Sequence, residues 1–179
     1  MESAVFMKES TPEIHKKDAE KSFSFALITI STSRYGKYGN PASPDEAEDL
    51  SGKAMKELLE AAGNKVSFYR LVPDGKDAIL DALFAALDSP TDIVITSGGT
   101  GLAPKDLTIE SVAPLFEKEI PGFGELFRYK SLEEIGTSVI LTRASAGIMK
   151  GKAVFCLPGS PNAVKLALSK IIIPEAGHI

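Results

Sequence analysis

A buried strand and a glycine-rich turn meet in the stretch Asp-Ile-Val-Ile-Thr-Ser-Gly-Gly-Thr-Gly-Leu-Ala-Pro-Lys-Asp, residues 92–106. The β-branched run at 93–95 is typical of a strand that is covered on both faces. Three glycines within residues 98–101 let the backbone adopt positive φ and approach a ligand closely. Successive N–H groups in such a turn form a concave nest that suits an anion. The stretch therefore predicts an α/β protein that binds a phosphorylated ligand at the end of a strand.

Strand and helix patterns alternate before this stretch. The apolar spacing predicts strands over 24–30 and 65–72 and helices over 50–62 and 79–87, with a long polar loop over 31–41. Consecutive strand–helix–strand units favour right-handed crossovers and a parallel sheet. The predicted fold is therefore an α/β three-layer sandwich with a mostly parallel sheet.

The pattern beyond residue 106 is more broken. It predicts four further helical segments, over 107–116, 124–129, 131–135 and 160–174. Two further strands are expected, over 137–141 and 153–157, and the segment 144–151 between them reads as a loop or tight turn. The last helix should begin at Ser160-Pro161, a hydroxyl N-cap followed by proline at the first helical position, and Pro174 should end it.

Length and composition are those of an ordinary globular chain, with 179 residues, 44% hydrophobic and 25% charged. Residues 1–22 mix both charges without an apolar period, so we expect a flexible extension there and a single domain over 23–179. The net charge of −4 argues against a nucleic-acid partner. No apolar run is long enough for a membrane span and no signal peptide is visible, which favours a cytoplasmic protein without a membrane partner.

Polar and glycine-rich segments should collect at one edge of the sheet, because the ligand crevice of a parallel sheet lies beyond the carboxyl ends of its strands. The candidate ligand-binding residues at this edge are Asp74, Ser97, Gly98, Gly99, Thr100, Gly101, Lys105, Asp106, Thr142, Arg143, Pro158, Gly159 and Ser160. Two of them, Asp74 and Asp106, are carboxylates. Carboxylates beside a phosphate site indicate Mg²⁺, since the ion bridges negative groups that otherwise repel each other.

Several familiar sites are excluded. Pro104 stands where both the G-x-x-x-x-G-K-[ST] and the G-x-G-x-x-G patterns would need glycine, so neither nucleotide fingerprint is present. The two histidines, His15 and His178, lie near the ends of the chain, which leaves no basis for a Ser-His-Asp triad or a histidine zinc site. Structural alternatives stay open for both carboxylates, because Asp74 suits a turn and Asp106 suits a helix cap.

Five segments, in this order along the chain, carry a family resemblance: Val-Pro-Asp at 72–74, Thr-Ser-Gly-Gly-Thr-Gly with Pro-Lys-Asp-Leu-Thr within 96–108, Pro-Gly-Phe-Gly-Glu with an arginine within 121–128, Leu-Thr-Arg-Ala-Ser-Ala-Gly-Ile at 141–148, and Leu-Pro-Gly-Ser-Pro at 157–161. The second resembles the signature T-[TS]-G-G-T-G-x-x-x-[RK]-D-x-T of the MoaB/MogA family of molybdenum cofactor biosynthesis proteins. The resemblance spans about residues 23–179. The Ser-Thr-Ser-Arg segment at 31–34 and the Gly-His-Ile ending resemble the MoaB branch.

The resemblance implies a molybdopterin-binding fold with one antiparallel strand in its sheet, assembled as a homo-trimer or homo-hexamer. It also implies adenylylation of molybdopterin by Mg²⁺-ATP with release of pyrophosphate, in molybdenum or tungsten cofactor biosynthesis. Asp74 and Asp106 match the acidic residues tied to catalysis and to Mg²⁺. The Gly98–Gly101 loop matches the one that holds the pterin phosphate, and Pro158-Gly159-Ser160 matches a wall of the pocket.

Two positions depart from the family pattern. Thr142 stands where many members have serine, and Thr32 stands where MogA-type members have aspartate. The alternative functions are a carrier that binds molybdopterin without adenylylating it and a scaffold of the same fold.

Overall fold

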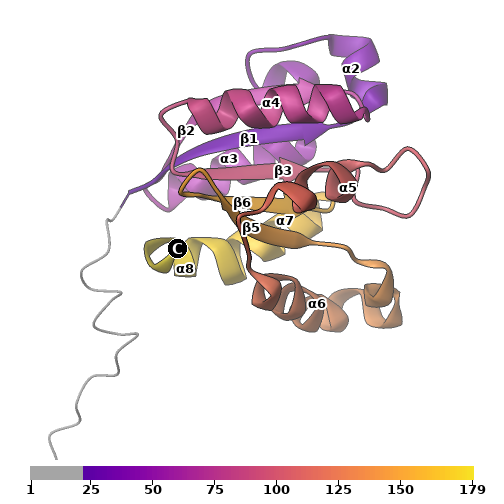
Figure 1. Ribbon diagram of the computed structural model, residues 1–179, viewed down its shortest axis with the longest axis vertical. Helices are drawn as coiled ribbons and strands as arrows, with labels where there is room; N and C mark the ends of the chain where they lie inside the picture. The colour runs from indigo at the N-terminus through magenta and orange to yellow at the C-terminus, as the bar shows by residue number, and fades with distance from the viewer. Residues whose placement is uncertain (1–21) are drawn as a thin grey trace, which may run out of the picture.

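The computed structural model describes residues 22–179, and within them a six-stranded sheet has the strand order β2-β1-β3-β6-β5-β4 (Figure 1). Its strands are β1 Ser24–Ile30, β2 Lys65–Val72, β3 Ile93–Ser97, β4 Lys118–Glu119, β5 Ser145–Met149 and β6 Lys152–Leu157. The pairs β1–β2, β1–β3 and β3–β6 are parallel. Strand β5 runs antiparallel to both of its neighbours, β4 and β6. The predicted α/β fold with one antiparallel strand is confirmed.

Helices cover both faces of this sheet. The α-helices are α2 Thr32–Tyr38, α3 Leu50–Ala61, α4 Lys76–Asp88, α5 Thr108–Val112, α6 Pro121–Ile135, α7 Pro161–Ala167 and α8 Ile173–Glu175. Shorter helical turns are η1 Asp45–Ala47, η2 Ala113–Leu115, η3 Gly136–Leu141, η5 Ala176–His178 and the π-helix η4 Leu168–Ile172. None of the helices formed by residues 22–179 is long and apolar enough to cross a membrane.

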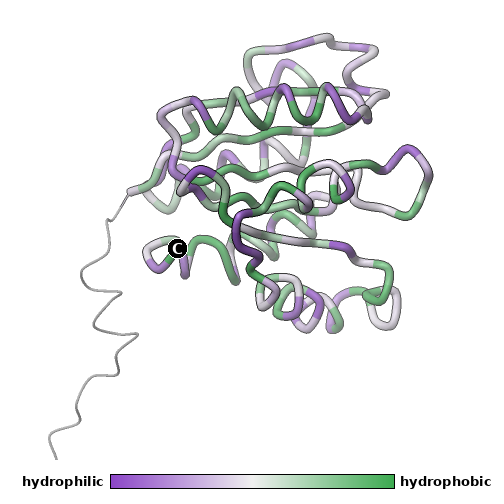
Figure 2. The backbone as a smooth tube through the Cα atoms, in the orientation of Figure 1, coloured by the Kyte–Doolittle hydropathy of each residue, from purple (hydrophilic) through white to green (hydrophobic). Residues whose placement is uncertain are grey.

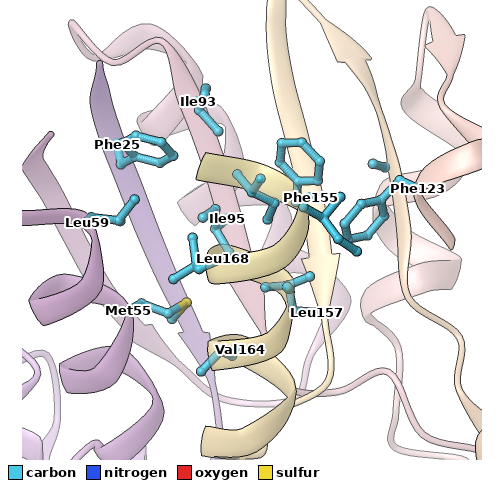
Figure 3. Close-up of a cluster of buried hydrophobic side chains, with 14 of the residues drawn as sticks. Phe25, Met55, Leu59, Ile93, Ile95, Phe123, Phe155, Leu157, Val164 and Leu168 are labelled. Carbon is cyan, nitrogen blue, oxygen red and sulfur yellow. The ribbon is translucent and has the colours of Figure 1, made fainter. Parts of the chain in front are cut away.

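Two apolar clusters fill the layers on either side of the sheet. One joins side chains of the sheet to α3, α6 and α7, where the Phe123 and Phe155 rings meet edge to face with centroids 4.9 Å apart (Figure 3). The other packs α4 and α5 against the opposite face. Apolar residues accordingly follow the strands, while polar residues dominate the outer sides of the helices (Figure 2). All five residues of β3 are buried, as its β-branched sequence predicts.

The prediction of a strand over 137–141 and a turn over 144–151 is wrong. The first segment lies in the 3₁₀-helix η3, where Ile140 is 80% exposed. The second segment contains the strand β5. Gly147 lies in β5 under the Phe116 ring, which leaves no room for a side chain. The actual turn is Lys150-Gly151, where both residues have positive φ.

Other differences are smaller. Within the expected loop 31–41, Ser31 caps the short helix α2 by accepting a hydrogen bond from the Arg34 amide. The pieces expected over 124–129 and 131–135 form one helix, α6, which begins at Pro121. The closing helix continues through Pro174 by way of the π-helical turn η4. The expected extension over 1–22 lies outside the described residues except for Ser22, and the division of the chain into extension and domain stays a prediction.

Candidate anion-binding site at the carboxyl ends of the parallel strands

The glycine-rich loop lies where three parallel strands end together. Register pairs Ser97 at the end of β3 with Thr29 of β1 and Leu157 of β6. The Gly98 amide donates to the Leu157 carbonyl oxygen at 3.0 Å, which extends this pairing beyond the strand. A Cβ atom added to Gly159 would lie 3.1 Å from the Gly98 Cα. The predicted segments after β3 and β6 therefore touch each other.

The backbone of this loop requires glycine at two successive positions. Gly98 has φ of +107° and Gly99 has φ of +61°, values that side-chain-bearing residues rarely adopt. A Cβ atom on Gly98 would lie 2.2 Å from the Ile30 carbonyl oxygen, and one on Gly99 would lie 2.4 Å from the Thr108 Oγ1. Conformation and space both exclude larger residues here.

All four carbonyl oxygens of the Gly98–Gly101 loop accept hydrogen bonds from the protein. Thr108 holds the first two: its Oγ1 donates to the Gly98 oxygen at 2.8 Å and its amide to the Gly99 oxygen at 2.9 Å. Arg143 holds the other two: its Nε donates to the Thr100 oxygen at 2.9 Å and its Nη2 to the Gly101 oxygen at 2.6 Å. The four carbonyl oxygens are thereby bonded to Thr108 and Arg143 and are not available to a ligand as free acceptors.

The amide side of the same loop is open. The N–H groups of Gly99, Thr100 and Gly101 have no acceptor within residues 22–179. Three successive amides without acceptors, in a loop whose oxygens are already bonded, form a concave set of donors that favours a phosphate group. The predicted anion nest would therefore consist of the amides of Gly99, Thr100 and Gly101.

Asp74 lies against this loop with one carboxylate oxygen bonded and one open. Its Oδ2 accepts from the Thr32 amide at 2.9 Å and the Thr32 Oγ1 at 2.7 Å, while its own amide donates to the same hydroxyl. Its Oδ1 would lie 3.3 Å from a Cβ atom on Gly99 and has no hydrogen-bond partner among the described residues. Thr32 thus orients Asp74.

Asp106 lies against the other end of the loop in a similar way. Its Oδ2 accepts from the Ala103 amide at 2.9 Å and would lie 2.5 Å from a Cβ atom on Gly101. Its Oδ1 has no protein donor in the part of the chain that the structure describes. Each aspartate therefore keeps one oxygen available beside the nest.

The two aspartates suit a magnesium ion that arrives with a phosphate ligand. No group of three or more His, Cys, Asp or Glu residues within 22–179 forms a protein-only metal site. Mg²⁺ is usually bound by one or two carboxylates together with substrate phosphates and water. One open oxygen on each of Asp74 and Asp106, beside a phosphate nest, fits that pattern.

The remaining predicted residues differ in how closely they approach the loop. Ser160 caps α7, where its Oγ accepts from the Ala163 amide at 3.2 Å, and it is exposed. Pro158 lies next to Gly159 at the end of β6 and is half-buried. Thr142 precedes Arg143, and its amide donates to the Val139 oxygen. Lys105 is exposed.

A buried carboxylate at the same edge escaped the sequence reading. Asp49 is 2% exposed and accepts from the Thr29 Oγ1 at 2.6 Å, the Tyr69 hydroxyl at 3.0 Å and the Gly52 amide at 3.0 Å. Burial, together with the Asp49 charge, raises the pKa of Tyr69. An aspartate three residues before Gly52 at a helix start signals an N-cap, but its strand partners depend on the pairing of β1 with β2.

A cavity of about 170 Å³ opens beside this carboxylate. Ser31, Arg34, Asp49, Ser51 and Ser97 are among the polar residues that line it. The Ser51 hydroxyl is held by the Gly159 oxygen at 2.7 Å, whereas the buried Ser97 Oγ has no partner among the described residues. An unpaired buried hydroxyl is costly and rare, so it marks a place where a ligand or water donates or accepts.

Comparison with known proteins identifies relatives of this chain. A family model described as "Probable molybdopterin binding domain" matches residues 26–178. The chain is 48% identical over 171 residues to a molybdopterin adenylyltransferase of Pyrococcus furiosus, covering 93% of this chain and 95% of that protein. It is 46% identical over 167 residues to molybdenum cofactor biosynthesis protein B of Bacillus subtilis, covering 92% of each. The solved structure of the tungsten cofactor synthesizing protein MoaB from Pyrococcus furiosus superimposes with a TM-score of 0.77 at 46% identity, covering 89% of this chain and 96% of that chain.

A mixed α/β sheet with open amides in a glycine-rich loop at the carboxyl ends of its parallel strands is typical of proteins that bind a phosphorylated ligand. The family match and the relatives make the class specific. The chain belongs to the family of molybdopterin-binding domains, and its resemblance to the MoaB/MogA proteins, in the MoaB-like branch, is confirmed.

Proposed function

We propose that this protein binds molybdopterin and transfers the adenylyl group of ATP to it, with release of pyrophosphate. The observation that carries the proposal is the loop itself: its four carbonyl oxygens are bonded to Thr108 and Arg143, while three of its amides have no acceptor among the described residues and lie beside two carboxylates. The names of the relatives from Pyrococcus furiosus and Bacillus subtilis support the same activity and pathway. One of the similar structures is described as tungsten-related, so the final metal is molybdenum or tungsten.

The transfer joins two anions, and the protein must therefore position them and offset their repulsion. An oxygen of the molybdopterin phosphate forms a bond to the α-phosphorus of ATP, and the bond from that phosphorus to the β-phosphate oxygen breaks. The amides of Gly99, Thr100 and Gly101 hold the pterin phosphate in line. Asp74 and Asp106 would hold Mg²⁺ through their Oδ1 atoms, and the bound ion supplies neutralisation of the phosphate charge.

A carrier that binds the pterin without transferring an adenylyl group is the second candidate. The structural bonds of the two aspartates favour it: Asp74 holds Thr32, and Asp106 holds the Ala103 amide. Both carboxylates would be needed for the local fold even without catalysis. A scaffold role is the third reading.

The Asp106→Asn variant separates these functions. An asparagine keeps an oxygen for the Ala103 amide but removes the charge, so we expect molybdopterin binding to persist while transfer falls by about 10²-fold or more. Product formation from α-labelled ATP and metal-free molybdopterin gives the rate, and quenching of pterin fluorescence gives the binding. Label transfer by the wild type supports the enzyme. Pterin binding without transfer supports the carrier, and full turnover of the variant contradicts the role of Asp106.

We also propose that the protein works as a homo-trimer or homo-hexamer in the cytoplasm. The supporting feature is an apolar face on α6 and η3, formed by Leu126, Tyr129, Leu132, Ile135, Ile140 and Leu141, which are 39–80% exposed. A groove of about 750 Å³ between α6 and α7 adjoins it. Apolar residues gathered in this way favour contact between copies. Light scattering measures the mass of the wild type and of Ile140→Glu in solution and so tests the proposed assembly. A monomeric wild type would contradict it.

A further inference from the structure

Arg143 approaches the loop from the side of its carbonyl oxygens. Its guanidinium donates to the Thr100 and Gly101 oxygens, and its two terminal nitrogens also donate to the two carboxylate oxygens of Glu110. These four bonds leave a single N–H of the guanidinium fork for any other acceptor. The positive charge is thus directed at two peptide oxygens and one carboxylate, not at the amide side where a phosphate would lie.

Glu110 lies on α5, which begins at Thr108, seven residues after the end of the glycine-rich loop. Its hydrogen bonds to Arg143 hold the pKa of its carboxyl below the usual range, so the pair stays charged at neutral pH. The Arg143 side chain is 27% exposed and that of Glu110 is 49% exposed. The pair connects three segments: α5, the glycine-rich loop, and the residues that precede β5.

We infer that Arg143, oriented by Glu110, is a positioning residue: its bond to the Thr100 oxygen fixes the peptide that carries the Gly101 amide, so that this amide faces the phosphate, and its bond to the Gly101 oxygen fixes the peptide that follows. This role rests on the proposed adenylyl transfer and specifies how the loop is prepared for it. A planar guanidinium is needed because one side chain must donate to two successive carbonyl oxygens and, through its other N–H groups, to the Glu110 carboxylate. Lysine carries the same charge but cannot supply that geometry.

Two variants distinguish positioning from direct neutralisation of the phosphate charge. Arg143→Lys keeps the positive charge, and Glu110→Gln removes a negative charge near an anion site. Direct neutralisation predicts a small effect for the first and tighter ATP binding for the second. Positioning predicts that both lower kcat, by about 10- to 100-fold, with a much smaller change in the KM for ATP. The control is Glu57→Gln, which removes the same charge from a 4.0 Å ion pair with Lys53 on the surface of α3.

Hydrogen exchange of the ligand-free protein provides a readout that does not depend on activity. The amides of Ala103, Asp106 and Thr108 are hydrogen-bonded within or next to the loop. If Arg143 positions the loop, these amides should exchange faster in Arg143→Lys and Glu110→Gln than in the wild type and Glu57→Gln.

The two readouts separate failure of this role from failure of the proposed function. Faster exchange in both variants, with a wild type that forms no adenylylated product, keeps the positioning role and overturns the proposed function. Unchanged exchange, or Glu110→Gln with the kcat of Glu57→Gln in an active protein, overturns the positioning role.

Discussion

Gly101→Ala should lower the rate of adenylyl transfer without a large loss of stability, because the added methyl group contacts only the Asp106 carboxylate. Gly101 is exposed and its φ is not in the left-handed region, so alanine is compatible with the backbone. The new Cβ would lie 2.5 Å from Asp106 Oδ2, 3.2 Å from its Cγ and 3.8 Å from its Oδ1. Ordinary contact between such atoms is about 3.5 Å. The carboxylate must therefore move by about 1 Å, which also weakens its bond to the Ala103 amide.

A displacement of about 1 Å at a reacting centre lowers rates by about 10²-fold. We therefore expect Gly101→Ala to lose about two orders of magnitude in kcat for adenylyl transfer, measured as pyrophosphate release. Its free energy of unfolding should change by less than about 1 kcal/mol, because the site is at the surface. Gly122→Ala is the matched control, since a Cβ atom there meets nothing within 4 Å. Full activity of Gly101→Ala would refute the placement of Asp106 as a functional group.

Three further outcomes follow from buried or bonded groups. Thr108→Val leaves the Gly98 carbonyl oxygen without its donor and should lower the free energy of unfolding in urea by about 1–3 kcal/mol; a change below about 0.5 kcal/mol would contradict this. Because Arg143 lowers the pKa of Glu110, this carboxylate adds stability above its ordinary pKa and loses it as the pH falls through the lowered value. The wild type should therefore exceed Glu110→Gln in Tm at pH 7, with the gap closing as the pH falls through the lowered pKa of Glu110, and a constant gap would refute the ion pair. Burial raises the pKa of Cys156 to about 12, so a thiol reagent should label it only in the unfolded protein, and rapid labelling in native buffer would contradict its burial.

Local patterns were enough to predict most of the parallel half of the sheet. The run at 93–97 is β-branched and polar only at its end, which is what a central strand requires, and the structure buries all of it. The three glycines within 98–101 were expected to let the backbone adopt positive φ; Gly98 and Gly99 do, whereas Gly101 does not. These features depend on residues that are adjacent in the sequence.

The features that were missed depend on residues that meet only after folding. Ile140 and its neighbours look like a strand because they are apolar, yet they lie exposed in η3. Gly147 lies in β5, paired with Val154, and the Phe116 ring packs where a side chain would lie. The direction of the Arg143 side chain, toward carbonyl oxygens and Glu110, likewise requires that α5 and the segment before β5 come together. A sequence shows an arginine near a phosphate loop, but not which side of the loop it approaches.

The crystal structure of the protein with molybdopterin bound tests the role of the loop most directly. Phosphate oxygens should lie within about 2.7–3.2 Å of the amide nitrogens of Gly99, Thr100 and Gly101, with Arg143 still bonded to the carbonyl oxygens behind them. A phosphate bound away from these amides, or held by Arg143 with the loop carbonyls released, would contradict the proposed site.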